Sequence, residues 1–166
     1  MRKIFVTFKI VSLLLLLQGC SNNGFHLRNS VELKPQFTKI YLQGITSKTD
    51  FTDTFTEALA EAEGKVVSTP ALAKSSIDFS KFEEGRRVIA YTSERRAREY
   101  LLFLKIEYSI NQPKTTSPTQ SKWRINIDRS YLYDPDFALG KAEEEKRVKQ
   151  ALYEEATRLI LLRLKY

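Results

Sequence analysis

Residues 100–110 read Tyr-Leu-Leu-Phe-Leu-Lys-Ile-Glu-Tyr-Ser-Ile, and this stretch decides the fold. Every second residue from Tyr100 to Ile110 is apolar, whereas Lys105, Glu107 and Ser109 stand in the opposite phase. Because successive side chains of a strand point to opposite faces of a sheet, this period of two predicts a long strand with one buried face. The rest of the chain must supply neighbours for this strand and a cover for its apolar face.

A hairpin partner is predicted directly before it, over residues 76–92. Ile77 and Phe79 stand in one phase of this segment and Phe82 in the other. Since one extra residue in a strand reverses the facing of everything beyond it, this slip predicts a β-bulge near Glu84-Gly85. The polar residues 92–96 form the tip between the two strands.

A third long strand is predicted over residues 122–133, where Trp123, Ile125 and Ile127 share one phase with two tyrosines. The segment 111–121 before it contains two prolines and many serines and threonines, which predicts a mobile loop.

Two amphipathic helices are predicted to cover the sheet. The first follows a short strand at 39–43, with Asp50 as its N-cap, apolar residues at helical spacing and Gly64 at its end. The second runs over about 137–164. Val66-Val67 is a candidate for a further short strand. The order β-α-β-β-β-α predicts an α+β two-layer sandwich, with two helices on one face of a mostly antiparallel sheet of about four strands.

The N-terminus is typical of a secretory signal peptide. Arg2, Lys3 and Lys9 accompany a short apolar stretch that leads into Leu17-Gln18-Gly19-Cys20. This ending resembles the lipobox of bacterial lipoproteins, in which the cysteine becomes the first mature residue and carries lipid. We therefore predict a cleaved signal peptide at 1–19, lipidation of Cys20, a tether at 20–38 and a single α+β domain at 39–166. Ser21, in the place where an aspartate is typical of inner-membrane retention, favours the outer membrane.

Composition argues against several classes of function. Cys20 is the only cysteine and His26 the only histidine, which leaves little for a thiol nucleophile, a Ser-His-Asp triad or a histidine-based metal site. No glycine-rich phosphate loop is present, so no cofactor is expected. Removal of residues 1–19 lowers the formal net charge from +7 to +4, which is too mild to predict a nucleic-acid-binding surface.

Four short segments carry a family resemblance. They are Gly24 to Arg28, Ala97 to Tyr100, Tyr131 to Asp134 together with Ala138 to Lys141 and Glu144, and Glu154 to Leu164. In this order they resemble the lipopolysaccharide-assembly lipoproteins of the LptE family, also called RlpB, and the match runs over most of the mature chain.

The resemblance implies a non-catalytic function. LptE-like proteins sit as a plug inside the outer-membrane β-barrel LptD, and the pair delivers lipopolysaccharide to the cell surface. Such a plug needs cations that meet the phosphates of lipid A, and the candidates are Arg95, Arg96, Arg98 and Lys141. Lys141 is chosen because it belongs to the matched Ala-Leu-Gly-Lys segment. The three arginines are chosen because they concentrate positive charge at the tip.

Other readings stay open at this stage. The chain has the features of an adaptor or pilotin-type lipoprotein that serves another envelope machine. It is also compatible with a periplasmic enzyme whose acid and base carboxylates are assembled only in space. An alternative interpretation of the tip arginines is that they are ordinary solvated surface charges that pair with Glu94 and Glu99.

Overall fold

The computed structural model describes residues 33–46, 49–112, 121–133 and 138–165, with side chains from residue 142 onward in the last segment. These residues belong to a compact unit that covers Val31–Tyr166. The predicted signal peptide, Cys20, the tether up to residue 32 and most of the 111–121 loop lie outside the described residues. No helix in the described part is long and apolar enough to cross a membrane.

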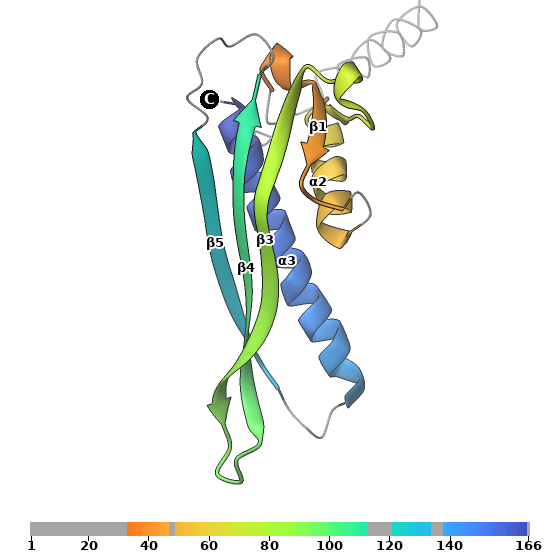
Figure 1. Ribbon diagram of the computed structural model, residues 1–166. Coiled ribbons are helices and arrows are strands. Elements are labelled where there is room, and N and C mark those ends of the chain that lie inside the picture. Colours follow the sequence, from red (N-terminus) through yellow and green to blue (C-terminus); the bar gives the residue numbers. More distant parts are fainter. Residues whose placement is uncertain (1–32, 47–48, 113–120, 134–137, 166) are drawn as a thin grey trace, which may run out of the picture. The chain divides into compact units, whose positions relative to one another are not determined.

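One five-stranded sheet forms the first layer of this unit (Figure 1). Its strands lie in the order β2-β1-β3-β4-β5. β1 is parallel to both of its neighbours, and β3, β4 and β5 are antiparallel. The strand bounds are β1 Lys39–Gln43, β2 Lys65–Val66, β3 Ser75–Tyr91, β4 Ala97–Asn111 and β5 Lys122–Leu132.

Two helices, α2 (Asp50–Glu61) and α3 (Ala138–Lys165), form the second layer on one face of the sheet (Figure 1). The predicted fold class is therefore confirmed, with one correction: the sheet has five strands rather than about four. The additional strand is β2, which is held to β1 by backbone N–H groups of Lys65 and Val67 that donate to Thr38 and Ile40. Two residues are too few to show a period, so only pairing with β1 makes this segment a strand.

The predicted alternation of β4 is confirmed by its burial. Leu102, Leu104, Ile106 and Tyr108 all face the helices and are at most 5% exposed. α2 contributes Phe51, Phe55 and Leu59 to the same core, and α3 contributes the residues of its apolar stripe. The stripe residues that are buried are Leu152, Tyr153, Ala156, Ile160, Leu161 and Leu164.

The phase slip in β3 is real, but its predicted place is wrong. Phe79 pairs with Tyr108 and Lys81 with Glu107, so Ser80 is the extra residue, whereas the register is continuous through Glu84 and Gly85. Phe79 is buried towards the helices, and Phe82 returns to the same face because Ser80 has been inserted between them. Gly85 instead makes room for the ring of Phe103, whose atoms lie 2.8 Å from where a Cβ would stand.

The ends of α2 also differ from the prediction. Thr49 rather than Asp50 is the N-cap, since its hydroxyl accepts from the backbone of Thr52 at 3.2 Å while the Thr52 hydroxyl accepts from the backbone of Thr49 at 2.9 Å. This reciprocal pair is a capping box built from two threonines. At the other end Glu63 takes the left-handed conformation, with φ of 60°, which the sequence pattern assigned to Gly64.

Candidate functional site

The tip of the β3–β4 hairpin carries three of the four predicted cations. Residues 92–96 join the strands, and the Thr92 N–H donates to the Arg96 carbonyl at 2.8 Å. This bond closes a loop of three residues, 93–95. The Arg96 N–H returns a bond to the Thr92 hydroxyl at 3.2 Å. Arg95, the third loop residue, has a φ of 60°. A turn followed by one left-handed residue is a common way to close a hairpin, and glycine is the usual residue at that last position.

The left-handed Arg95 predicts a gain in stability for its replacement by glycine. A non-glycine residue in this region costs on the order of 1 kcal/mol, so Arg95→Gly is expected to raise the free energy of unfolding by about 0.5–1 kcal/mol. Arg96→Gly, at a position with an ordinary negative φ, is expected to lower it slightly because glycine only adds freedom to the unfolded chain. Denaturant titration of both variants checks this, and equal effects would show that the turn is unstrained.

The tip arginines lack a carboxylate partner among the residues that the structure describes. Arg95, Arg96 and Arg98 are all exposed, and within the described residues none of them forms an ion pair. The carboxylate of Glu94, one of the expected partners, accepts instead from the Ser93 hydroxyl at 2.7 Å, which lowers the pKa of Glu94. The structure thus brings three cations together at one end of the sheet without a described counter-charge.

Lys141 lies in the first turn of α3, and its side chain falls outside the described part of the chain. α3 begins at the end of the sheet from which the hairpin tip projects (Figure 1). The helix start and the three arginines therefore share one end of the domain.

Large apolar side chains gather at the same end, which the sequence analysis missed. Tyr91 is 62% exposed, Leu132 is 72% exposed, and Ile89 is also exposed. Register links two of these residues to the tip, because Tyr91 pairs with Ala97 and Leu132 pairs with Glu99. Leu132 was detectable in the sequence as an apolar residue in the polar phase of β5. The end of the hairpin is consequently both cationic and apolar.

Two clusters of hydrogen bonds and ion pairs connect the sheet to α3. In the first, Glu145 of α3 accepts from Arg86 at 2.6 Å and from the Tyr131 hydroxyl at 2.7 Å. In the second, Glu84 accepts from the Tyr153 hydroxyl at 2.5 Å and pairs with Lys149 at 2.8 Å. Both glutamates connect a sheet strand to α3, so they hold the part of the sheet that carries the tip.

Burial, followed by these hydrogen bonds, raises the pKa of Tyr131 and of Tyr153 to about 12, and burial alone raises that of Tyr108 to about 12. Between pH 10 and 12 the folded chain keeps protons that the unfolded chain has lost. The stability that these groups contribute is therefore present below pH 10 and falls as the pH rises to 12.

We expect Tyr153→Phe to make that fall shallower, although it also lowers stability at neutral pH by removing the bond to Glu84. Denaturant midpoints across pH 8–12 check this prediction. Parallel pH profiles for the variant and the parent chain would contradict it.

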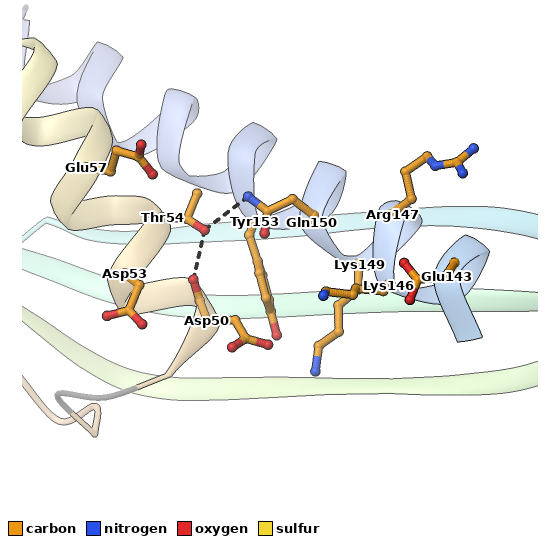
Figure 2. Close-up of a pocket in the computed structure, with 10 residues that line it drawn as sticks. All are labelled: Asp50, Asp53, Thr54, Glu57, Glu143, Lys146, Arg147, Lys149, Gln150 and Tyr153. Atoms are coloured by element: carbon orange, nitrogen blue, oxygen red, sulfur yellow. Dashed lines mark hydrogen bonds between the residues drawn. The ribbon is translucent and has the colours of Figure 1, made fainter. Parts of the chain in front are cut away.

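A groove of about 560 Å³ lies between α2 and α3 (Figure 2). Asp50, Asp53 and Glu57 line its α2 side, and three basic residues together with Glu143 line its α3 side, with Tyr153 between the two sides. The Gln150 amide donates to the Thr54 hydroxyl across the groove at 3.3 Å. The basic residues are Lys146, Arg147 and Lys149.

Most of the groove's cationic charge already has a partner. Lys149 pairs with Glu84, and Arg147 pairs with Glu144 at 3.0 Å. The opposed charges attract the two helices to one another, so we interpret the groove as part of the helix–helix contact. The hairpin tip is the stronger candidate for a functional surface.

The comparisons with known proteins decide the family. The sequence model of LptE, described as lipopolysaccharide-assembly, matches residues 37–164. This chain belongs to the LptE family. The resemblance inferred from the four short segments is therefore confirmed, and family membership assigns the chain to lipopolysaccharide assembly. The search among curated proteins finds no matching relative.

Solved lipoprotein structures share the fold of this LptE-family chain. An uncharacterized lipoprotein B from Nitrosomonas europaea superposes with a TM-score of 0.66 at 19% identity, over 86% of this chain and 90% of that one. The rare lipoprotein B from Shewanella oneidensis gives a TM-score of 0.61 at 21% identity, over 76% and 92%. A minor lipoprotein from Acinetobacter baumannii gives 0.60 at 16% identity, over 78% and 91%. At these identities the likeness concerns the fold alone.

Proposed function

We propose that this protein is an outer-membrane lipoprotein, anchored through lipid on Cys20, that plugs an LptD-like β-barrel and contacts lipopolysaccharide on its way to the cell surface. Membership of the LptE family over residues 37–164 is the observation that carries the proposal. The lipobox-like ending at Cys20 supports the anchor, and Ser21 supports the outer-membrane destination.

Direct contact with lipopolysaccharide is assigned to the hairpin tip. Arg95, Arg96 and Arg98 offer planar guanidinium groups that bind phosphate oxygens through paired hydrogen bonds. They need not break an ion pair with a described residue before they do so. Tyr91 and Leu132 add exposed apolar surface beside them, as an amphiphile with phosphates and acyl chains requires.

Charge reversal tests the cationic part of this assignment. We expect Arg95→Glu, Arg96→Glu and Lys141→Glu together to weaken lipopolysaccharide binding by on the order of tenfold or more at low salt, where exposed charges are least screened. The matched control reverses three exposed cations away from the tip, Lys39, Lys65 and Arg158, and is expected to retain binding. Thermal unfolding of both triple variants shows that the body remains folded. Unchanged binding by the tip variant would remove the tip from the function.

The barrel partnership is tested separately by affinity capture of the full-length protein from gently solubilised envelopes. A large outer-membrane β-barrel is expected to co-purify, and its mass identifies it. Recovery of free monomer alone would contradict the plug, whereas a barrel of another envelope machine would favour the adaptor or pilotin reading. Substitution of Cys20 by serine is expected to release the protein from the membrane fraction.

A further inference from the structure

The β5 strand leaves a long sheet edge without a partner in the described part of the chain. β5 pairs with β4 on one side and ends the strand order of the sheet. It runs for 11 residues, and its register with β4 is continuous from Lys122 to Leu132. The opposite edge is formed by β2, which has only two residues. β5 is therefore one of two long edges among the described strands. The other is the part of β3 beyond Asp78, which β1 does not reach and whose register with β4 is irregular.

Only part of the usual protection of such an edge is present here. Natural sheets protect exposed edges with short strands, charged side chains, proline, bulges or charges that point inward, and β5 carries four charged residues, Lys122, Arg124, Asp128 and Arg129. β5 contains no proline, and its pairing with β4 shows no bulge. Its one charge on the helix side, Arg129, is neutralised by Glu155 at 2.6 Å. The edge is thus suited to receive another strand.

The side-chain pattern of β5 is self-complementary about Asn126. Register with β4 places the even-numbered residues of β5 on the face away from the helices. In an antiparallel pair of two β5 strands centred on Asn126, Arg124 of each copy stands opposite Asp128 of the other. On the helix side Ile125 stands opposite Ile127. Asp128 has no ion pair within the described residues, so this pairing supplies its first partner.

Neighbouring registers are poorer. A pair centred on Ile127 places Asn126 opposite Asp128 and Ile125 opposite the charged Arg129. A pair centred on Ile125 shortens the ladder, and its only opposite charges are Lys122 and Asp128. The Asn126 register also places Trp123 opposite the charged Arg129. It alone, however, combines Ile125–Ile127 pairs on one face with two Arg–Asp pairs on the other.

The helix layer covers one face of β5 and leaves its backbone edge without a described partner. α3 crosses the sheet obliquely (Figure 1). Its C-terminal part meets β5, where Arg163 lies over the Trp123 ring at 4.2 Å, and its N-terminal part reaches β3 through Glu145 and Arg86. α3 also meets β5 at Arg129, which pairs with Glu155, and at Tyr131, which donates to Glu145. It therefore covers one face of β5 over most of its length, whereas the backbone edge of β5 has no partner among the described strands.

We propose that β5 is an interaction surface for a second copy of this chain. The two β5 strands pair antiparallel about a two-fold axis at Asn126, and the two sheets become one. Such an interface is isologous, since each copy contributes the same edge. The inference concerns the protein outside the barrel and stands independently of the function proposed above.

A cysteine on the two-fold axis tests the register. In the full-length chain, Asn126→Cys brings two thiols opposite each other with Cα atoms about 4.5–5.5 Å apart, within disulfide range. Ser130→Cys is the matched control, because residue 130 is exposed like residue 126 but its two copies stand about 26 Å apart along the strands. On mild oxidation in envelopes we expect on the order of tenfold more covalent homodimer from the first variant than from the second. The unsubstituted chain is oxidised in parallel, and any covalent dimer that it forms measures disulfide formation through Cys20.

Charge exchange tests the pairing itself. When Asp128→Arg is added to Asn126→Cys, the new arginine of each copy stands opposite Arg124 of the other. The yield of covalent dimer is then expected to fall to that of the Ser130→Cys variant. Arg124→Asp is expected to do the same, although it also removes the contact of Arg124 with Glu107. The two changes together restore opposite charges and are expected to restore the dimer. Thermal unfolding confirms that each variant is folded.

Three results would overturn the proposal. They are no excess of dimer at residue 126 over residue 130, full dimer in the Asp128→Arg variant, and a disulfide from residue 126 to a different protein. The last result would assign the edge to another partner.

Discussion

Replacement of Gly44 by alanine is expected to lower the free energy of unfolding by about 3 kcal/mol or more. Gly44 follows β1 with a φ of 79°, in the left-handed region that favours glycine. A Cβ there would lie 2.2 Å from the backbone oxygen of Phe79 and 3.0 Å from its carbonyl carbon. Because the obstacle is the backbone of β3, relief requires β1 to move away from the strand with which it pairs.

Gly85→Ala is the control for this prediction. The atoms nearest its new Cβ belong to the Phe103 ring, at 2.8 and 3.1 Å, and that ring is only half-buried. A side chain can turn aside where a backbone cannot, so we expect a cost of about 1 kcal/mol. Chemical denaturation measures both variants. A Gly44→Ala protein as stable as Gly85→Ala would mean that β1 is not held against β3 as described.

Phe51→Ala is expected to cost about 3–5 kcal/mol. The Phe51 side chain is fully buried where α2 meets both the sheet and α3. Its ring centroid lies 5.1 Å from that of Phe82, 6.0 Å from that of Phe79 and 5.8 Å from that of Tyr153. Truncation removes contacts to β3 and α3 at once, and the surrounding rings cannot collapse together to fill the space.

Leu72→Ala is the corresponding control, since Leu72 is 60% exposed and is expected to change stability by less than about 0.5 kcal/mol. The free energy of unfolding from denaturant titration checks the pair. A small effect of Phe51→Ala, close to that of Leu72→Ala, would show that α2 is not packed into the common core.

Much of the architecture could be predicted from local patterns. The period of two in residues 100–110 predicted β4 and its buried face, and apolar residues at helical spacing predicted α2 and α3. The polar segment 92–96 predicted the hairpin tip. These inferences succeeded because burial of one face imposes a repeat that can be recognised within each element.

Pairing order and exact register were decided by the tertiary structure. Nothing in residues 39–43 indicates that β1 lies parallel between β2 and β3, because a strand reads the same whichever neighbour it has. The bulge is at Ser80 rather than near Glu84-Gly85, since a phase change in the sequence shows that a residue is inserted but not where the partner strand accommodates it.

The candidate site divides in the same way. The sequence by itself placed Arg95, Arg96 and Arg98 at a hairpin tip, because polar residues between two alternating segments predict a turn. Only the folded chain showed that these arginines have no described ion-pair partner and that Tyr91 and Leu132 are exposed beside them. Composition and period are properties of neighbouring residues, whereas partners and exposure depend on which distant segments the sheet and α3 bring together.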